Sequence, residues 1–452
     1  SWLTRYVRGD LLPTLIAIEA GVAVVGGFSA LALFAVFAWL PGAFRSLFYL
    51  TVGAVGIAVG LEIPLLTRAL KRFGALRTVL SSVFAVDYGG ALLASLLYPL
   101  LLYPVLGVAR TALVASLFNL LGGGLILYAY RHRGAIWRPG LAALCVAALL
   151  VGAGLAAAER LTNLIDRRLY WPEELVYAQA SPYQHLAVTE KRSGSVQLYL
   201  DGHLQFSSED EARYHEPLVH VPMALARDPK RVLVLGGGDG LVARELLKYP
   251  TVESIVLVDL DPMVTGLARR HPLLTRVNGG ALDDPRVQIV NVDAFTWLSE
   301  RRDGGFDVAI ADLPDPSTPA LARLFSVQFY RLVRAALQPD GVVAVQAGSP
   351  YFARRAYWSI VASVEEAGFE TLPYHVTVPS FGEWGFVAGS PAPLPPPGGL
   401  RVRVPTRFLD DAVLPTLFVW PRDMARVEVP PHTLLSPQLP DLFLEGWRSH
   451  AF

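Results

Sequence analysis

Cysteine and net charge are what this chain most plainly lacks. Its 452 residues include a single cysteine, Cys145, so no disulfide can form within the chain. Lysine plus arginine and aspartate plus glutamate both number 39, so charge gives no reason to expect a nucleic-acid partner. The nine histidines are scattered and no metal-binding motif occurs. We therefore expect no nucleic acid and no metal as ligands.

Charged residues are also few, at 17%, whereas hydrophobic residues reach 53% and the mean hydropathy is +0.40. This excess lies in the first third of the chain. Five apolar runs there are long enough to cross a bilayer: residues 11–40, 46–70, 88–106, 108–130 and 141–158. A buried helical core is the alternative, but such runs leave almost no polar faces. We predict an α-helical transmembrane domain at residues 1–158, in contact with the lipid bilayer of the cell membrane as a multi-pass protein.

The chain begins at Ser1 without an initiator methionine. Its first apolar run is too long for a signal peptide and lacks a cleavage site of small residues. We therefore expect that residues upstream of Ser1 are missing or were removed.

Basic residues give an ambiguous orientation in the membrane. They cluster at residues 68–77 and 131–138, which predicts that both loops are cytoplasmic. A single span at 141–158 would then place the C-terminal half outside the cell, whereas nucleotide-like cofactors are found inside. We give the cofactor more weight and expect a cytoplasmic catalytic domain, but the two arguments conflict.

Five polar residues interrupt the apolar runs, and such groups are costly in lipid unless they face a partner or a cavity. They are Glu19, Glu62, Asp87, Arg110 and Asn119. A cation path or a lipid-like pocket is one interpretation. Pairing between helices, for example of Asp87 with Arg110, is the interpretation that we favour.

The second half has the patterns of a water-soluble α/β protein. Residues 159–173 have helical spacing and predict an amphipathic connector, and the alternating runs within 174–222 predict a small antiparallel β-domain. Buried strands then alternate with helices over 223–390, which predicts a doubly wound, mostly parallel sheet that binds a nucleoside. The Pro-rich residues 391–452 are expected to pack on this domain as an appendage.

A glycine-rich turn follows the first strand of this sheet. Gly236-Gly-Gly-Asp-Gly240 allows a cofactor to approach the backbone at a helix N-terminus, and Gly236 and Gly238 are its first candidates for cofactor contact. Leu241 stands where a dinucleotide fingerprint would have its third glycine. Asp239 would repel a phosphate and attract an amine, so the turn favours a sulfonium cofactor over NAD.

Acidic residues end the next strands along the chain. Asp259 follows the glycine turn where an acid typically holds ribose hydroxyls, and Asp293 could accept from an adenine amino group. Asp312 and Asp315 end the strand at 306–312. Three carboxylates with no obvious cation, Asp239 included, predict a positively charged substrate, because a cation relieves their mutual repulsion.

Seven short motifs occur in an order that resembles the spermidine synthase (polyamine aminopropyltransferase) family. They are Ser181-Pro-Tyr-Gln184, Leu200-Asp-Gly-His-Leu-Gln205, Asp210-Glu-Ala-Arg-Tyr-His-Glu216, Gly236-Gly-Gly-Asp-Gly240, Asp284-Pro-Arg286, Asp312-Leu-Pro-Asp-Pro316 and Gln346-Ala-Gly-Ser-Pro350. The resemblance covers about residues 174–390. The whole chain is similar to the bacterial multi-pass membrane branch of the family, in which further helices usually precede the point where this chain starts.

The resemblance implies decarboxylated S-adenosylmethionine as co-substrate, a small-molecule amine such as putrescine or another polyamine as acceptor, and a homo-oligomer. It also implies a role for each of several residues. Gln184 and Gln205 line the cofactor pocket, Asp259 holds the ribose, Asp293 the adenine and Asp239 the aminopropyl ammonium. Asp312 accepts a proton from the attacking amine, and Asp315 and Tyr214 orient that amine.

The acceptor side departs from the family pattern. The soluble enzymes usually have Asp-Ser-Ser-Asp where this chain has Asp312-Leu-Pro-Asp315, and a tyrosine where it has Phe381. Glu383 and Trp384 follow in the same loop and are candidates for acceptor binding. Two alternatives therefore stay open: a methyltransferase that uses intact S-adenosylmethionine, and a non-enzymatic polyamine sensor or transporter.

Overall fold

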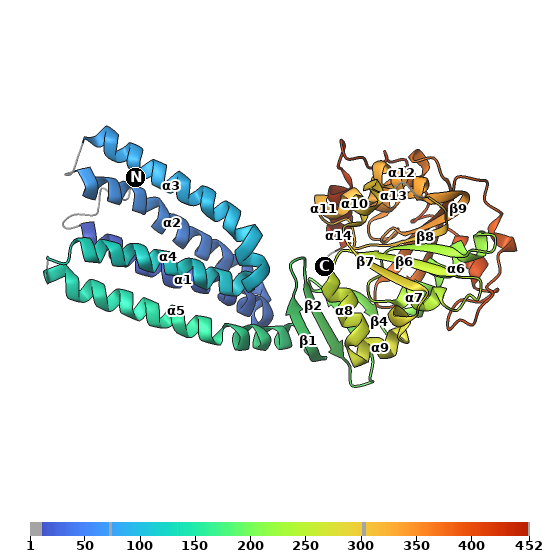
Figure 1. Cartoon of the computed structure of the whole chain (residues 1–452), viewed down its shortest axis with the longest axis horizontal. Coiled ribbons are helices and arrows are strands. Elements are labelled where there is room, and N and C mark those ends of the chain that lie inside the picture. The colour runs from blue at the N-terminus through green and yellow to red at the C-terminus, as the bar shows by residue number, and fades with distance from the viewer. Residues whose placement is uncertain (1–10, 72–74, 133, 301–303, 451–452) are drawn as a thin grey trace. The chain divides into compact units, whose positions relative to one another are not determined.

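The computed structural model describes residues 11–71, 75–132, 134–300 and 304–450. It divides into two compact units, Ser1–Arg192 and Ser193–Phe452 (Figure 1). The first unit consists mainly of long helices, and the second contains a large sheet covered by helices (Figure 1).

Five long helices build the first unit. They are α1 (Leu11–Trp39), α2 (Phe44–Leu70), α3 (Leu76–Leu97), α4 (Tyr103–Ala129) and α5 (Gly134–Leu169). Helix α1 packs against α2, α4 and α5. By length and composition, four stretches could cross a membrane: Leu11–Trp39, Pro41–Leu70, Arg77–Ala129 and Trp137–Leu169.

The third of these stretches is broken at Gly107. It has 53 residues, which as one straight helix would extend about 80 Å, far more than a bilayer core of about 30 Å. Gly107 has φ of +69° and ψ of 175°, just after a π-helical turn at Tyr98–Leu102. The Thr111 hydroxyl donates to the Leu102 carbonyl at 3.0 Å. The chain turns back here (Figure 1), at the point where the sequence predicts a division between its third and fourth runs.

Small residues let these helices approach closely. A Cβ atom added to Gly27, Gly123 or Gly154 would lie within 2.9 Å of a side chain on a neighbouring helix. Arg110 on α4 donates to Glu159 on α5 at 2.8 Å. The predicted pairing of Arg110 with Asp87 is therefore wrong, because the carboxylate that Arg110 contacts is on the helix packed beside α4.

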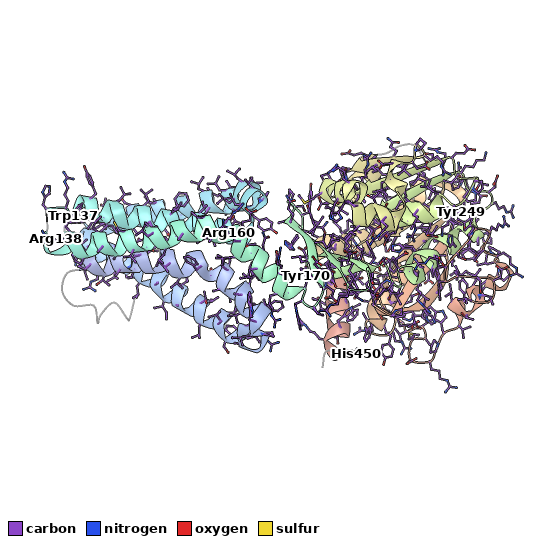
Figure 2. All side chains as sticks on the ribbon, turned by 90° about the horizontal axis from the view of Figure 1, so that it is seen from below. Trp137, Arg138, Arg160, Tyr170, Tyr249 and His450 are labelled. Atoms are coloured by element: carbon purple, nitrogen blue, oxygen red, sulfur yellow. The ribbon has the colours of Figure 1, made fainter. Side chains whose placement is uncertain are left out.

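Helix α5 runs without interruption from the last apolar run into the predicted connector. Trp137 and Arg138 lie near one of its ends, and Arg160 and then Tyr170 lie toward the other (Figure 2). Two strands follow, β1 (Glu174–Ala180) and β2 (His185–Glu190), which pair antiparallel.

The second unit begins with an antiparallel pair, β3 (Val196–Leu200) and β4 (His203–Ser207), and helix α6 (Ala212–Leu225). A seven-stranded sheet follows, in the order β10-β11-β9-β8-β5-β6-β7. Its parallel strands are β5 (Arg231–Gly236), β6 (Ser254–Asp259), β7 (Val287–Asn291), β8 (Phe306–Asp312) and β9 (Leu337–Gln346). The antiparallel hairpin of β10 (Glu370–Val378) and β11 (Gly382–Ser390) forms one edge. The predicted mostly parallel sheet is confirmed.

Both faces of this sheet are covered. Alternate residues of β5 enter different apolar clusters: Leu233 and Leu235 join one, and Val232 and Val234 join the other. The helices include α7 (Leu241–Leu246), α8 (Pro262–Arg270), α9 (Pro272–Asn278), α10 (Ala294–Glu300), α12 (Val327–Ala336), α13 (Arg354–Glu366) and α14 (Leu439–His450). A sheet buried on both faces explains why its strands are continuous apolar runs in the sequence.

Candidate active site

The parallel strands bring the glycine turn and the strand-end acids to one edge. Gly236 at the end of β5 is in register with Asp312 at the end of β8. Gly236 has φ of +82°, and a Cβ atom there would lie 1.9 Å from the Asp312 carbonyl oxygen. The turn therefore requires glycine, and it places its backbone beside Asp312 at the edge where such sheets bind ligands.

Asp259 is held by the same turn. Its two carboxylate oxygens accept from the backbone N–H groups of Gly238, at 3.1 Å, and Asp261, at 2.9 Å. A Cβ atom at Gly238 would approach this carboxylate to 2.5 Å, so only glycine fits. Burial raises the pKa of Asp259 to about 6, against the effect of the two N–H donors.

Asp239 lies at the start of α7, where its carboxylate accepts from the Leu241 N–H at 2.9 Å. Its backbone carbonyl accepts from the Asn278 amide at 2.9 Å. The negative charge of Asp239 is close enough to raise the pKa values of Tyr214, His215 and Asp312. Asp239 and Asp312 are therefore close enough for their charges to influence each other.

Tyr214 on α6 donates to Asp312 Oδ1 at 2.7 Å. Burial and then the charge of Asp312 raise the pKa of Tyr214 well above 10, so its hydroxyl stays a donor. Burial also raises the pKa of Asp312 to about 6, partly opposed by the positive charge of His215. Asp312 is therefore poised between its acid and base forms near neutral pH, as a group that accepts a proton should be.

Asp315 follows three residues later. Burial raises its pKa to about 7, and the Gln346 side chain partly opposes this. Its Oδ1 atom is buried and has no hydrogen-bond partner among the residues that the structure describes. An unpaired buried carboxyl oxygen is costly, so this atom is suited to a ligand that brings a donor.

Two aromatic rings that are predicted to bind the acceptor, those of Phe381 and Trp384, lie beside the ring of Tyr214. The rings of Phe381 and Trp384 lie 6.0 and 6.4 Å from that of Tyr214, and 5.2 Å from each other. Trp384 Nε1 is buried and finds no partner within the described parts of the chain. Glu383 instead contacts His375 and Thr377 across the β10–β11 hairpin, and its carboxylate is thus occupied.

Three other residues are predicted to bind the cofactor: Asp293, Gln205 and Gln184. The Asp293 carboxylate accepts from the Thr296 N–H and hydroxyl at 2.9 Å and pairs with Arg323. The Gln205 amide, on β4, donates to the His203 carbonyl at 3.2 Å. Gln184 belongs to the other unit, between β1 and β2. Their roles toward a cofactor stay predictions.

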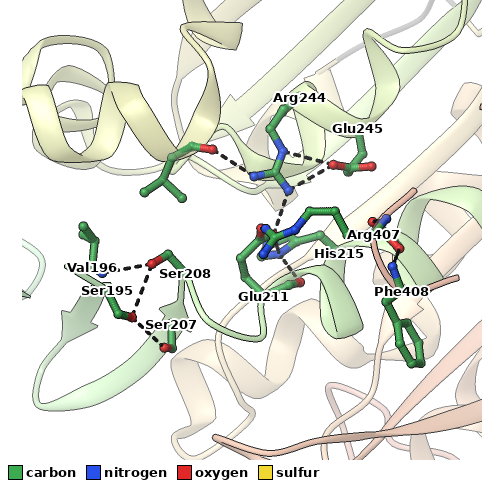
Figure 3. A network of polar contacts seen from close by, with 12 residues as sticks. Ser195, Val196, Ser207, Ser208, Glu211, His215, Arg244, Glu245, Arg407 and Phe408 are labelled. Carbon is green, nitrogen blue, oxygen red and sulfur yellow. Dashed lines mark hydrogen bonds and ion pairs between the residues drawn. The ribbon is translucent and has the colours of Figure 1, made fainter. Parts of the chain in front are cut away.

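A buried network of charges under the site was not predicted. Glu211 accepts from Arg244 at 2.7 Å and Arg407 at 2.9 Å, and its carboxylate lies 3.2 Å from His215 Nδ1 (Figure 3). Burial would raise the pKa of Glu211, but His215 and Arg244 outweigh it and lower it to about 2. Burial would lower the pKa of His215, but Glu211, Asp239 and Asp312 raise it to about 9.

A positive charge, the His215 imidazolium, thus lies beside the acids of the site. A local signal was present, since Glu211 and His215 belong to the same seven-residue motif as Tyr214. Arg407, which pairs with Glu211, is 196 residues away from it along the chain, and no local pattern could have indicated this contact.

No group of three or more His, Cys, Asp or Glu side chains is arranged to hold a metal ion within the described ranges. His220, for example, contacts Glu245 and the Tyr249 hydroxyl, each at 2.9 Å. These buried groups pair with one another and stabilise the fold.

Comparison with known proteins agrees with this geometry. Residues 211–394 match the model of the spermine/spermidine synthase domain family. Polyamine aminopropyltransferase 2 of Ralstonia nicotianae is 46% identical, over 99% of this chain and 88% of its own length. Polyamine aminopropyltransferase 1 of Streptomyces coelicolor is 41% identical, over 96% of this chain and 82% of its own.

A solved structure of spermidine synthase in complex with the transition-state analogue AdoDATO is also similar. It is 28% identical, with a TM-score of 0.51, over 55% of this chain and 86% of that one. Both relatives match nearly the whole chain, including the helical unit, and the solved enzyme shares the fold. The chain therefore belongs to the polyamine aminopropyltransferase (spermidine synthase) family, and it is a transferase.

Proposed function

We propose that this protein transfers the aminopropyl group of decarboxylated S-adenosylmethionine to an amine acceptor, with Asp312 as proton acceptor, and that its helical unit anchors it in a membrane. The observation that carries the proposal is the convergence of Asp239, Asp312 and Asp315 around Tyr214. The His215 imidazolium already pairs with Glu211, so the three acids favour a cationic ligand.

Each reactant carries positive charge. The donor has a sulfonium and a primary ammonium, and Asp239 at the glycine turn is the group that would hold the ammonium. Asp259, fixed by the Gly238 and Asp261 N–H groups, would hold the ribose. Intact S-adenosylmethionine has a carboxylate on the carbon that bears this ammonium, and Asp239 would repel it.

The acceptor amine is protonated at neutral pH and must lose a proton before it can attack. Asp312 would take that proton, and the nitrogen lone pair would then form a bond to the carbon next to sulfur while the carbon–sulfur bond breaks. Methylthioadenosine leaves with the electron pair of that bond. Tyr214 holds Asp312 in place through its 2.7 Å hydrogen bond, so the base and the carbon can be aligned.

The donor preference is tested by calorimetry on the purified full chain in detergent. Decarboxylated S-adenosylmethionine should bind more tightly than the intact form, and Asp239→Asn should remove this preference. Asparagine keeps an oxygen to accept from the Leu241 N–H, so the substitution changes the charge and preserves the turn. Tighter binding of the intact form by the wild type would favour a methyltransferase instead.

Transfer itself is tested by mass spectrometry with the donor and a panel of amines. A new aminopropyl-amine together with methylthioadenosine is the expected result. Absence of transfer to every amine in the panel, with the donor bound, would refute the transferase activity that we propose.

The membrane location rests on the four long apolar stretches and on the large apolar side chains that they expose. Cys145 is the only cysteine, so Cys145→Ser gives a background for single introduced cysteines. With a cytoplasmic catalytic unit, a cysteine at Asp340 should react with a membrane-impermeant maleimide only after the cells are opened. Labelling of intact cells would place that unit outside.

A further inference from the structure

The C-terminal helix α14 packs directly on the turn that precedes α13. Leu439, Leu442 and Phe443 are buried. A Cβ atom at Gly446 would lie 2.7 Å from Ala353 Cα, so α14 contacts the backbone of this turn. This helix lies beyond the residues that match the family domain, which end at 394.

A row of aromatic rings connects α14 to the start of β11, the strand that carries Trp384. The Trp447 and Phe352 rings are stacked, with centroids 4.8 Å apart, and Phe443 lies 6.1 Å from Trp447. On its other side, Phe352 Cε2 lies 2.8 Å from the position that a Cβ atom on Gly382 would occupy. Gly382 begins β11, two residues before Trp384.

Gly348 lies between Asp315 and Phe443 of α14. A Cβ atom there would have Asp315 Oδ1 at 3.7 Å and Phe443 Cε2 at 3.9 Å as its nearest neighbours beyond the adjoining residues. Asp315 Oδ1 is the buried carboxyl oxygen that finds no hydrogen-bond partner in the described ranges. Gly348 therefore separates a charge-bearing acceptor atom on one side from an aromatic ring on the other.

We propose that α14 forms a wall of the acceptor pocket, with Phe443 as a specificity-determining residue and Trp447 as a positioning residue that holds it. This inference rests on the proposed function and extends it to the acceptor. An acceptor whose ammonium nitrogen adjoins a methylene chain suits this pair of groups: the nitrogen donates to the Asp315 carboxylate and the methylene groups pack on the Phe443 ring. The appendage thereby acts in acceptor selection.

The test is steady-state kinetics of the full chain with a series of α,ω-diamines of increasing chain length. Phe443→Ala should raise the KM for the preferred diamine at least about fivefold, the loss expected when one or two methylene groups lose apolar contact. It should also shift the order of kcat/KM toward longer diamines, because removal of the Phe443 ring opens room beside Asp315. The affinity for the donor, measured by calorimetry, should not change.

Phe443→Leu is the second variant, because it keeps apolar volume in the core and should give a smaller shift in the same direction. Trp447→Phe should raise the KM for the diamine while kcat changes less. Glu445→Gln is the matched control: its side chain is exposed on the same helix, 3.7 Å from Arg355, and it should leave the kinetics unchanged.

Two negative results are distinguishable. A wild type that transfers aminopropyl groups, together with Phe443 variants whose KM and diamine order are unchanged, would overturn the role of α14 alone. Variants that lose activity equally toward every diamine, or that lose donor affinity, would show a structural role and would also overturn it. A wild type that transfers nothing would instead refute the proposed function.

Discussion

The two units of this protein treat apolar side chains in opposite ways. Helices α2 to α4 expose large apolar side chains such as Phe48, Leu93 and Phe118. In the second unit residues of the same kinds form the core, and the exposed large apolar side chains among its described residues are Leu260, Tyr351, Val419, Leu434 and Leu435. One unit has a surface suited to lipid, as we propose, and the other a surface suited to water.

The charged pairs of the two units differ as well. In the helical unit the Arg110–Glu159 pair has side chains 43% and 71% exposed. The second unit buries Glu211 and His215 almost completely, with matched partners, and it also buries acids that have too few partners. The second unit therefore has two kinds of buried charge. Pairs such as Glu211 and His215 stabilise the fold, and acids such as Asp315 are suited to bind a ligand. Substitutions at each kind of buried charge test this division.

The largest effect is expected at Asp312. Asp312→Asn should lower kcat by about 10²–10⁴-fold, because the amide cannot take a proton from the acceptor. Binding of decarboxylated S-adenosylmethionine should persist, since the asparagine oxygen can still accept from Tyr214. Rapid-quench kinetics of the transfer step measures this. Asp340→Asn, at an exposed acid, is the control, and a loss in kcat below tenfold for Asp312→Asn would exclude Asp312 as the base.

The next largest effect concerns a buried charge with matched partners. Glu211→Gln should destabilise the second unit by about 3–5 kcal/mol, because Arg244 and His215 would stay buried beside an uncharged amide. Denaturant titration of the full chain, followed by the tryptophan fluorescence of that unit, measures the change. A loss below about 1 kcal/mol would mean that the network contributes little to folding.

The same pair predicts how stability varies with pH. The pKa of Glu211 is lowered to about 2. The stability that this carboxylate contributes is therefore present above about pH 4.5 and is lost as the pH falls toward 2. The pKa of His215 is raised to about 9, so its contribution is present below about 6.5 and is lost as the pH rises through 9. Glu211→Gln should reduce the alkaline part of this loss, while Asp239 and Asp312 still raise the pKa of His215. An unchanged alkaline limb would assign it to another group.

A substitution at one of the site acids, Asp315, should increase the stability of the protein instead of decreasing it. The pKa of Asp315 is raised to about 7, so the stability that this acid contributes is present below about 4 and is lost as the pH rises through 7. Asp315→Asn should therefore stabilise the ligand-free protein at pH 8 by about 1–2 kcal/mol while it impairs acceptor binding. Thermal melts at pH 5 and pH 8 measure this. A variant that is less stable at pH 8 would mean that Asp315 has a structural partner.

The sequence predicted those parts of the site that are close together along the chain. Strands β5 and β8 are apolar runs that end in Gly236 and Asp312, and parallel pairing brings such ends together. The turn at Gly107 was indicated in the same way, because the apolar runs 88–106 and 108–130 are divided at this glycine. Each of these signals lies within a few residues of the feature that it specifies.

Contacts between distant segments could not be predicted. Arg407 contacts Glu211 across 196 residues, and Glu383 pairs with His375 only because of the register of the β10–β11 hairpin. Phe443 approaches Gly348 because α14 folds back on the turn before α13. Nothing in the local pattern of α14 distinguishes a helix that lines a site from one that merely covers the core, so its part in the acceptor pocket emerged only from the structure.

The smallest effect is expected at the exposed pair of the helical unit, and its size is informative for that reason. Arg110 follows the break at Gly107, and Glu159 follows the last apolar run, so both should lie where the helices leave the lipid. In water such a pair is worth less than about 1 kcal/mol. A double-mutant cycle of Arg110→Gln and Glu159→Gln in detergent or bicelles should therefore give a coupling energy below that value. A coupling of several kcal/mol would place both side chains in apolar surroundings and move the predicted membrane boundary beyond Glu159, because ions taken out of water depend on each other far more strongly.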